Sequence, residues 1–242
     1  MKPDFKAFKN LAGKFSLVPT YEELPSDLET PVTVFLKVSR PNPYSALLES
    51  VEGGEKLGRY SFISVSHHLR FESSGRQIEV EDEKGKRRFQ CKDALNELRK
   101  ILIGLDAASI PELPRFCGGA VGMVSYDMAR NFERLPHRLN GENIVPDMLF
   151  LFTDECVVFD HWKHKMFLIK WNRIGEKSER SLKKVYRQAE KSLQSLYHLY
   201  SQLCDHIHHY FSTFQSPGQS ADALRTALYF FWELILTRPV RE

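Results

Sequence analysis

The chain has 242 residues, of which 42% are hydrophobic, and this is enough for the core of one large domain or two small ones. Its 34 basic and 31 acidic residues are spread along the chain and give a net charge of +3. This balance excludes the strong basic footprint of a nucleic-acid-binding or membrane-surface protein. We find no apolar run long enough to span a membrane and no signal peptide, so we expect a cytoplasmic protein with neither nucleic acid nor membrane as a partner.

The four cysteines, Cys91, Cys117, Cys156 and Cys204, lie far apart and form no CxxC pair. Such spacing is typical of reduced thiols in a cytoplasmic protein and gives neither a disulfide framework nor a zinc site. We therefore expect the cysteines to be structural.

Taken in chain order, the first half of the sequence is rich in short β-type segments. Residues 32–38 ("VTVFLKV") are β-branched and aromatic and predict a strand ended by the Pro-rich turn that follows, and "SALLESV" predicts a second strand. Four further segments, 59–65, 69–73, 77–83 and 86–91, predict an antiparallel meander with glycine-containing hairpin connections. His67 and His68 fall between two of these segments, where we expect exposed turn residues.

Residues 91–105 repeat apolar side chains at helical spacing and predict an amphipathic helix that covers the sheet. Residues 117–127 ("CGGAVGMVSYD") predict a strand, and residues 148–171 predict two strong strands joined at "DHWKHK", where His161 and His164 are expected at the turn. Because strands come in runs and do not alternate with helices, the pattern indicates an α+β fold with mostly antiparallel sheets.

From about residue 176 the sequence predicts a long polar helix with a thin apolar stripe at Leu182, Val185, Ala189, Leu193 and Leu196. The composition then changes: residues 1–191 contain 17 lysines and residues 192–242 contain none, while four of the nine histidines fall in this last stretch. Two interpretations stay open, a non-native sequence from a shifted reading frame and a genuine helical extension.

Most local motifs point away from catalysis. The glycines Gly118, Gly119 and Gly122 match neither GxGxxG nor a phosphate-loop lysine motif, so we interpret them as sites of close packing within the sheet. The cluster "CDHIHH", residues 204–209, offers metal-ligand types, but helical spacing would put only part of it on one face. No GxSxG, HExxH or paired-carboxylate motif is present, so we assign no catalytic residue and no metal ligand.

The segment "LLES", residues 47–50, has a different chemistry. A free amino acid needs a carboxylate for its ammonium group, hydroxyl or amide donors for its carboxylate, and an apolar surface for its side chain. Glu49, Ser50 and Leu48 offer these three features at the end of a strand. Since side chains alternate along a strand, Leu48 and Ser50 should face one side, and Leu47 and Glu49 the other.

Three motifs in order, "PYSALLES", "GRYSFI" and "GGAVGMVSYD" followed by "ERLP", resemble the N-terminal domain of anthranilate synthase component I over about residues 10–195. The resemblance implies two orthogonally packed antiparallel sheets flanked by helices. It also implies that Leu48, Glu49 and Ser50 help to bind the feedback inhibitor L-tryptophan. The complete enzyme of that family converts chorismate to anthranilate and pyruvate with magnesium, using ammonia from a glutamine amidotransferase subunit.

The family's catalytic half has no counterpart after residue 195 of this sequence. We therefore expect an N-terminal regulatory domain over residues 1–195, an atypical tail over 196–242, no cofactor held by this chain, and no catalysis by the chain alone. Two alternatives stay open: the related large component of aminodeoxychorismate synthase, from folate synthesis, and a non-catalytic interaction module of the same fold.

Overall fold

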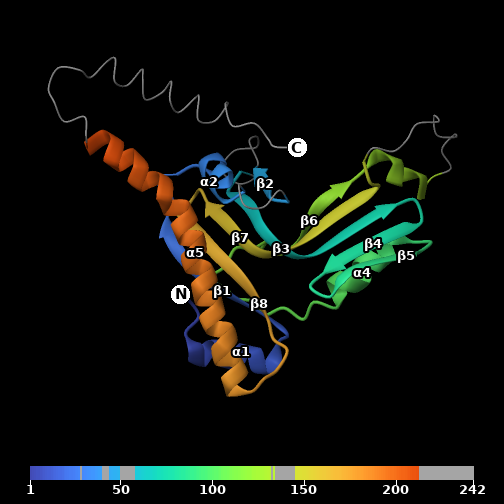
Figure 1. Ribbon diagram of the computed structural model, residues 1–242, viewed down its shortest axis with the longest axis horizontal. Helices are drawn as coiled ribbons and strands as arrows, with labels where there is room; N and C mark the ends of the chain where they lie inside the picture. Colours follow the sequence, from blue (N-terminus) through green and yellow to red (C-terminus); the bar gives the residue numbers. More distant parts are fainter. Residues whose placement is uncertain (28, 40–43, 50–57, 132, 134–144, 213–242) are drawn as a thin grey trace, which may run out of the picture. The chain divides into compact units, whose positions relative to one another are not determined.

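The computed structural model describes residues 1–27, 29–39, 44–49, 58–131, 133 and 145–212 (Figure 1). The chain divides into two compact units, residues 1–199 and 200–242, and only the end of the last helix is described in the second unit. The division falls inside that helix, so the domain boundary expected near residue 195 stays a prediction.

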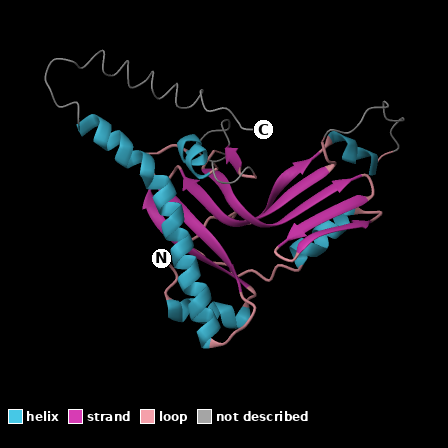
Figure 2. Cartoon of the chain, in the orientation of Figure 1, coloured by secondary structure: helices cyan, strands magenta, loops and turns pink. Residues whose placement is uncertain are grey.

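The described part contains four α-helices and eight strands (Figure 2). The helices are α1 (Phe5–Lys14), α2 (Pro31–Val38), α4 (Ala94–Ile103) and α5 (Glu179–Ser212), and a 3₁₀ turn, η1, covers Tyr126–Asn131. The strands are β1 (Leu17–Pro25), β2 (Ala46–Glu49), β3 (Tyr60–Ser74), β4 (Gln77–Asp82), β5 (Gly85–Gln90), β6 (Gly119–Val124), β7 (Met148–Asp160) and β8 (Lys165–Arg173). The expected α+β class is confirmed.

All strand pairs are antiparallel and join into one eight-stranded sheet with the path β1-β8-β7-β3-β4-β5, to which β2 adds through β3 and β6 through β7. The long strands β3 and β7 run through two halves of this sheet. In the first half, the C-terminal part of β7 pairs with β8 and the N-terminal part of β3 pairs with β2. In the second half, the N-terminal part of β7 pairs with β6 and the C-terminal part of β3 pairs with β4.

The two halves meet where the β3–β7 pairing shifts register three times between Ser64 and Leu69. Such bulges bend a strand and increase its local twist. The two sheets expected from the resemblance thus take the form of two halves of one sheet that share β3 and β7.

Helices cover each half separately. In the second half, Ala94 and Leu98 of α4 pack with Phe71 of β3 and with Ile78 and Val80 of β4. In the first half, Leu182 at the start of α5 packs with Phe8 and Ala12 of α1 and with Val18 of β1. The apolar stripe expected on the long helix is confirmed, because Leu182, Ala189, Leu193 and Leu196 are buried. The helix expected over residues 91–105 is confirmed as α4.

The strand expected over residues 32–38 is wrong, because this segment forms α2. Thr30 caps the helix in a reciprocal capping box with Thr33, and Pro31 occupies its first turn. Val34 and Val38, one helical turn apart, are both fully buried. The cap and the burial of this face outweigh the β-propensity of the valines.

The expected break in the meander at His67 and His68 is also wrong. Both histidines lie inside the single strand β3, next to the register shifts, and the side chain of His68 is only 7% exposed. Its Nδ1 lies 2.8 Å from Oδ1 of Asp154. By contrast, His161 and His164 are exposed at the β7–β8 turn, as predicted.

No helix within the described ranges is both long and apolar enough to cross a membrane.

Candidate functional site

The strand β2 carries two of the three residues expected to bind a ligand. Leu48 pairs with Phe62 of β3, and Glu49 pairs with Ser61. Ser50 lies outside the described residues, so its expected role remains a prediction.

A small cavity lies beside β2 and brings the three motifs of the sequence together. Its lining comes from "PYSALLES" (Ala46, Leu48), from "GRYSFI" and the next residue (Phe62, Ile63, Ser64), from the segment around "GGAVGMVSYD" (Phe116, Gly118, Val121) and from β7 (Thr153, Cys156). These segments are far apart in the chain and meet only because β3 pairs with both β2 and β7.

The cavity has aromatic walls and a polar floor. The rings of Phe62 and Phe116 meet edge to face with centroids 4.9 Å apart. Oγ of Ser64 and Oγ1 of Thr153 form a buried hydrogen bond of 2.9 Å. The cavity volume is about 10 Å³, which is room for one water molecule and far below the ~300 Å³ of a typical small-molecule pocket.

Leu48 and Glu49 face opposite sides of β2, as strand alternation requires. Leu48 lines the cavity and is 45% exposed, whereas Glu49 is exposed and does not line it. On the side of Glu49, Oγ of its cross-strand neighbour Ser61 lies 2.8 Å from Nε2 of His161. Leu48 and Glu49 can therefore contact one ligand only if it reaches around the exposed edge or end of β2.

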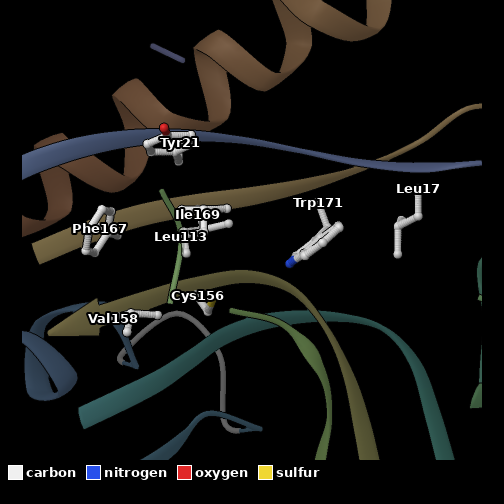
Figure 3. Packing of buried hydrophobic residues seen from close by; sticks show 8 residues of the cluster. All are labelled: Leu17, Tyr21, Leu113, Cys156, Val158, Phe167, Ile169 and Trp171. Carbon is white, nitrogen blue, oxygen red and sulfur yellow. The ribbon is translucent and has the colours of Figure 1, made fainter. Parts of the chain in front are cut away.

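The loop before β6 is hydrogen-bonded to β7 and β8 through a single carbonyl group. The indole nitrogen of Trp171 donates to the carbonyl oxygen of Cys117 at 2.7 Å, and Sγ of Cys156 contacts the same oxygen at 3.0 Å. Trp171 and Cys156 belong to one buried apolar cluster on this face of the sheet (Figure 3).

Two of the three glycines in this loop and strand are required by close packing. A Cβ on Gly118 would lie 2.0 Å from Nε1 of Trp171, and a Cβ on Gly122 would lie 2.0 Å from the carbonyl oxygen of Leu149 on β7. Since real Cβ atoms do not approach other atoms so closely, the packing role expected for these two glycines is confirmed. Gly119 differs, because it has a positive φ of +110° and a Cβ there would meet Cε2 of Phe116 only at an ordinary contact distance of 4.0 Å.

The cysteines near the cavity are suited to packing and not to nucleophilic chemistry. Cys91, Cys117 and Cys156 are free thiols, as expected. Burial raises the pKa of Cys117 to about 11. Burial, followed by the nearby Cys117 and Glu155, raises the pKa of Cys156 well above its ordinary value. Both thiols therefore stay protonated at neutral pH and are weak nucleophiles.

A second polar feature lies where β3 starts and β7 ends. The guanidinium of Arg59 donates two hydrogen bonds to Asp160, at 3.0 and 2.7 Å, and lies over the rings of Tyr60 and Trp162. This fork anchors the start of β3 to the end of β7. Arg59 belongs to the "GRYSFI" motif, so its contacts with Asp160, Tyr60 and Trp162 give part of that motif a structural role that needs no ligand.

Some residues of the site were not predicted from the sequence. Phe62, Ser64, Phe116, Thr153 and Cys156 were assigned to strands or loops without a binding role. Thr153 faces the cavity because the register shift lies between it and Glu155, and simple alternation along β7 gives no sign of that shift.

No group of three or more His, Cys, Asp and Glu side chains in the described part of the chain is arranged to hold a metal ion. The side chains of residues 204–209 lie outside the described part, so the partial metal cluster considered there stays untested.

A larger, open groove of about 660 Å³ lies at β1 and the β7–β8 turn, away from the three motifs. Several of its charged groups pair with one another: Lys2 and Lys165 with Glu23, and His164 with Asp27. Since none of the three motifs contributes to the lining of this groove, the cavity beside β2 is the better candidate.

Known proteins similar to this chain point to one family. No protein-family model matches the sequence. The chain is 35% identical over 167 residues to anthranilate synthase component 1 of Acetivibrio thermocellus, covering 69% of this chain and 34% of that protein. It is 33% identical over 191 residues to the protein of the same name from Synechocystis sp., covering 78% of this chain and 37% of that protein.

The crystal structure of anthranilate synthase component I from Streptococcus pneumoniae TIGR4 aligns with 72% of this chain and 37% of that chain, at 24% identity and a TM-score of 0.44. The chain thus spans about a third of the length of the curated relatives that it matches. On the sequence identities, the chain is a homologue of anthranilate synthase component I and corresponds to about a third of such a protein.

Proposed function

We propose that this chain is the regulatory part of an anthranilate synthase component I and contributes one wall of a binding site for the feedback inhibitor L-tryptophan. The observation that supports this best is the meeting of three separate motifs of the resemblance at one cavity beside β2. Homologues named anthranilate synthase component 1, at 33 to 35% identity, supply the family context.

The proposed ligand sits at the exposed side of β2, since the cavity of about 10 Å³ is too small to enclose an indole ring. Leu48 offers an apolar contact, Glu49 a carboxylate for the ammonium group, and Ser50 a hydroxyl for the carboxylate of the amino acid. Because this chain provides only one wall of the site, few contacts offset the entropic cost of association, and the expected affinity is weak.

The proposed role excludes independent catalysis. In the complete enzyme, chorismate is converted to anthranilate and pyruvate with magnesium, and a glutamine amidotransferase subunit supplies ammonia. We propose that those steps and the magnesium ligands lie in the part of the relatives that this chain does not match. Incubation of the purified chain with chorismate, magnesium and ammonium should give no anthranilate fluorescence above background.

Calorimetric titration with L-tryptophan tests the binding role. The wild-type chain should give weak heats of binding, and both Ser50→Ala and Glu49→Gln should abolish them. Ser109→Ala is the matched control, because this exposed serine lies outside the cavity lining and should leave the heats unchanged.

Absence of binding by the wild-type chain would contradict the proposal and favour a non-catalytic interaction module. Unchanged heats for Ser50→Ala would remove Ser50 from the site even if tryptophan binds.

A further inference from the structure

The β3–β7 pair has different neighbours on its two faces at the register shifts. Before the first shift, Ser64 of β3 pairs with Cys156 of β7; after it, Ser66 pairs with Glu155. Cys156 packs in the apolar cluster on the cavity side, so strand alternation places Glu155 on the opposite face. The cavity and the groups that contact Glu155 thus lie on opposite faces of the same short part of β3 and β7.

On the cavity face, the two strands are joined by side chains as well as by backbone. The 2.9 Å hydrogen bond between Ser64 and Thr153 is buried, and both residues line the cavity. Any atom that enters the cavity between these hydroxyls must separate them or take over their hydrogen bond.

On the opposite face, the strands hold helix α5. Oγ of Ser66 donates to Oε2 of Glu155 at 2.7 Å, and Oγ of Ser192 on α5 donates to Oε1 of the same carboxylate. Nζ of Lys170 lies 3.6 Å from Glu155 and 3.7 Å from Asp154. The neighbours of Ser192 on the helix, Ala189, Leu193 and Leu196, are buried.

Glu155 is therefore shared between the sheet and the helix at the point where the sheet bends. Its two oxygens are used by Ser66 and Ser192, so a shift of β3 against β7 moves the acceptor on which Ser192 depends. Close-packed interiors have low compressibility and transmit strain, so such a shift is passed on to the helix.

We propose that the bulged β3–β7 pair couples the cavity to helix α5, so that parting Ser64 from Thr153 weakens the Ser192–Glu155 hydrogen bond and loosens the helix. Glu155 and Ser192 act in this as positioning residues, without contact to the ligand. The inference rests on the proposed function for the identity of the ligand, but the coupling itself belongs to this chain and can be measured without one.

Amide hydrogen exchange in the α5 segment 183–199 tests the coupling in the whole chain. Thr153→Val removes the cavity-side hydroxyl at nearly constant volume and should speed exchange in α5, and Ser192→Ala should do the same from the helix side. Since one hydrogen bond contributes about 0.5–1.5 kcal/mol, each substitution should speed exchange about 2- to 10-fold. In the double variant, the effect of Thr153→Val should disappear, because the link that carries it is gone.

Exchange rates in α5 are compared with those in β8, so that a loss of global stability is not mistaken for coupling. Ser73→Ala is the matched control: this buried serine of β3 lies away from the bulge, and its hydroxyl has no hydrogen-bond partner among the residues that the structure describes. If Thr153→Val folds poorly, Ser64→Ala makes the same test. Unchanged α5 exchange in both cavity variants, or independent effects in the double variant, overturns the proposal.

L-Tryptophan gives the second arm of the test. If it binds, its contact with Leu48, which lines the cavity beside Ser64 and Thr153, should change exchange in α5 of the wild type by a similar factor and leave the helix of Ser192→Ala unaffected. Binding without any change in α5 contradicts the coupling. If L-tryptophan does not bind, only the proposed function is contradicted. The exchange rates of α5 in Thr153→Val, Ser192→Ala and the double variant then decide whether the coupling exists.

Discussion

The two halves of the sheet are built from different sequence patterns, although two strands run through both. β8 in the first half is buried on both faces along most of its length, whereas β4 in the second half alternates between buried and less buried residues and every residue of β5 is exposed. A strand covered on both sides needs a continuous apolar run such as "MFLI", and a strand covered on one side needs only every second residue. Apolar burial therefore dominates the first half, whereas the edge of the second half relies on charge pairs.

Truncation of a side chain in each half should give the largest contrast. Leu168→Ala in β8 removes a fully buried side chain and should lower the free energy of unfolding by about 2–5 kcal/mol. Phe89→Ala in β5 removes a larger side chain that is 42% exposed, and should cost less than about 1 kcal/mol. Urea denaturation of both variants measures the difference. Equal losses would show that the second half depends on burial as much as the first.

Gly118→Ala should produce the next largest effect, again in the first half. The new methyl group would displace the indole of Trp171, which donates to the carbonyl of Cys117, and such overpacking costs typically about 1–3 kcal/mol. Gly175→Ala is the control, since its Cβ meets no atom within 4 Å and its φ is not positive. A thermal melt in which both variants lose the same stability would show that the contact with Trp171 is not the cause.

Much of this fold follows from the sequence, because long periodic segments carry their own signal. The helix α5 and the strands β7 and β8 were predicted from periodicity and β-propensity, and burial of the expected residues confirms them. The segment 32–38 was misread, since its valines suit a strand and only its cap and its buried face select the helix.

The candidate site could be predicted only in part. The order of the three motifs singled out the segment that forms β2, and the chemistry of "LLES" suggested a ligand. The cavity itself depends on pairings between strands that are distant in the sequence. Thr153 and Ser64 meet across a register shift, and a shift of one residue leaves no mark in local composition. The role of Glu155 was missed for the same reason, because its neighbours Ser66 and Ser192 come from other elements.

Loss of the cap of α2 should have a smaller effect, in the first half of the molecule. Thr30→Ala removes the hydroxyl that accepts from the backbone nitrogen of Thr33 at 3.2 Å, and should lower stability by about 0.5–2 kcal/mol. Thr30→Ser keeps the hydroxyl and should restore most of the loss. Equal unfolding midpoints for Thr30→Ala and the wild type would mean that Pro31 and the buried valines suffice to start the helix.

The smallest effect is expected at the charged edge of the second half, and it should depend on pH. Hydrogen bonds from Lys86 at 2.5 Å and Arg88 at 2.7 Å outweigh the cost of burial and lower the pKa of Glu79 to about 2. Because the pKa in the folded state lies below that in the unfolded chain, Glu79 stabilises the fold above about pH 4.5, and this contribution is lost as pH falls towards 2. Urea denaturation between pH 5 and pH 2 should therefore show a shallower loss of stability in Glu79→Gln than in the wild type.

Glu81→Gln, which removes a half-exposed carboxylate 3.1 Å from Arg70, should keep a slope close to that of the wild type. Equal slopes for Glu79→Gln and the wild type would mean that the charge pairs of β4 and β5 add no stability, and that burial alone holds both halves of the sheet.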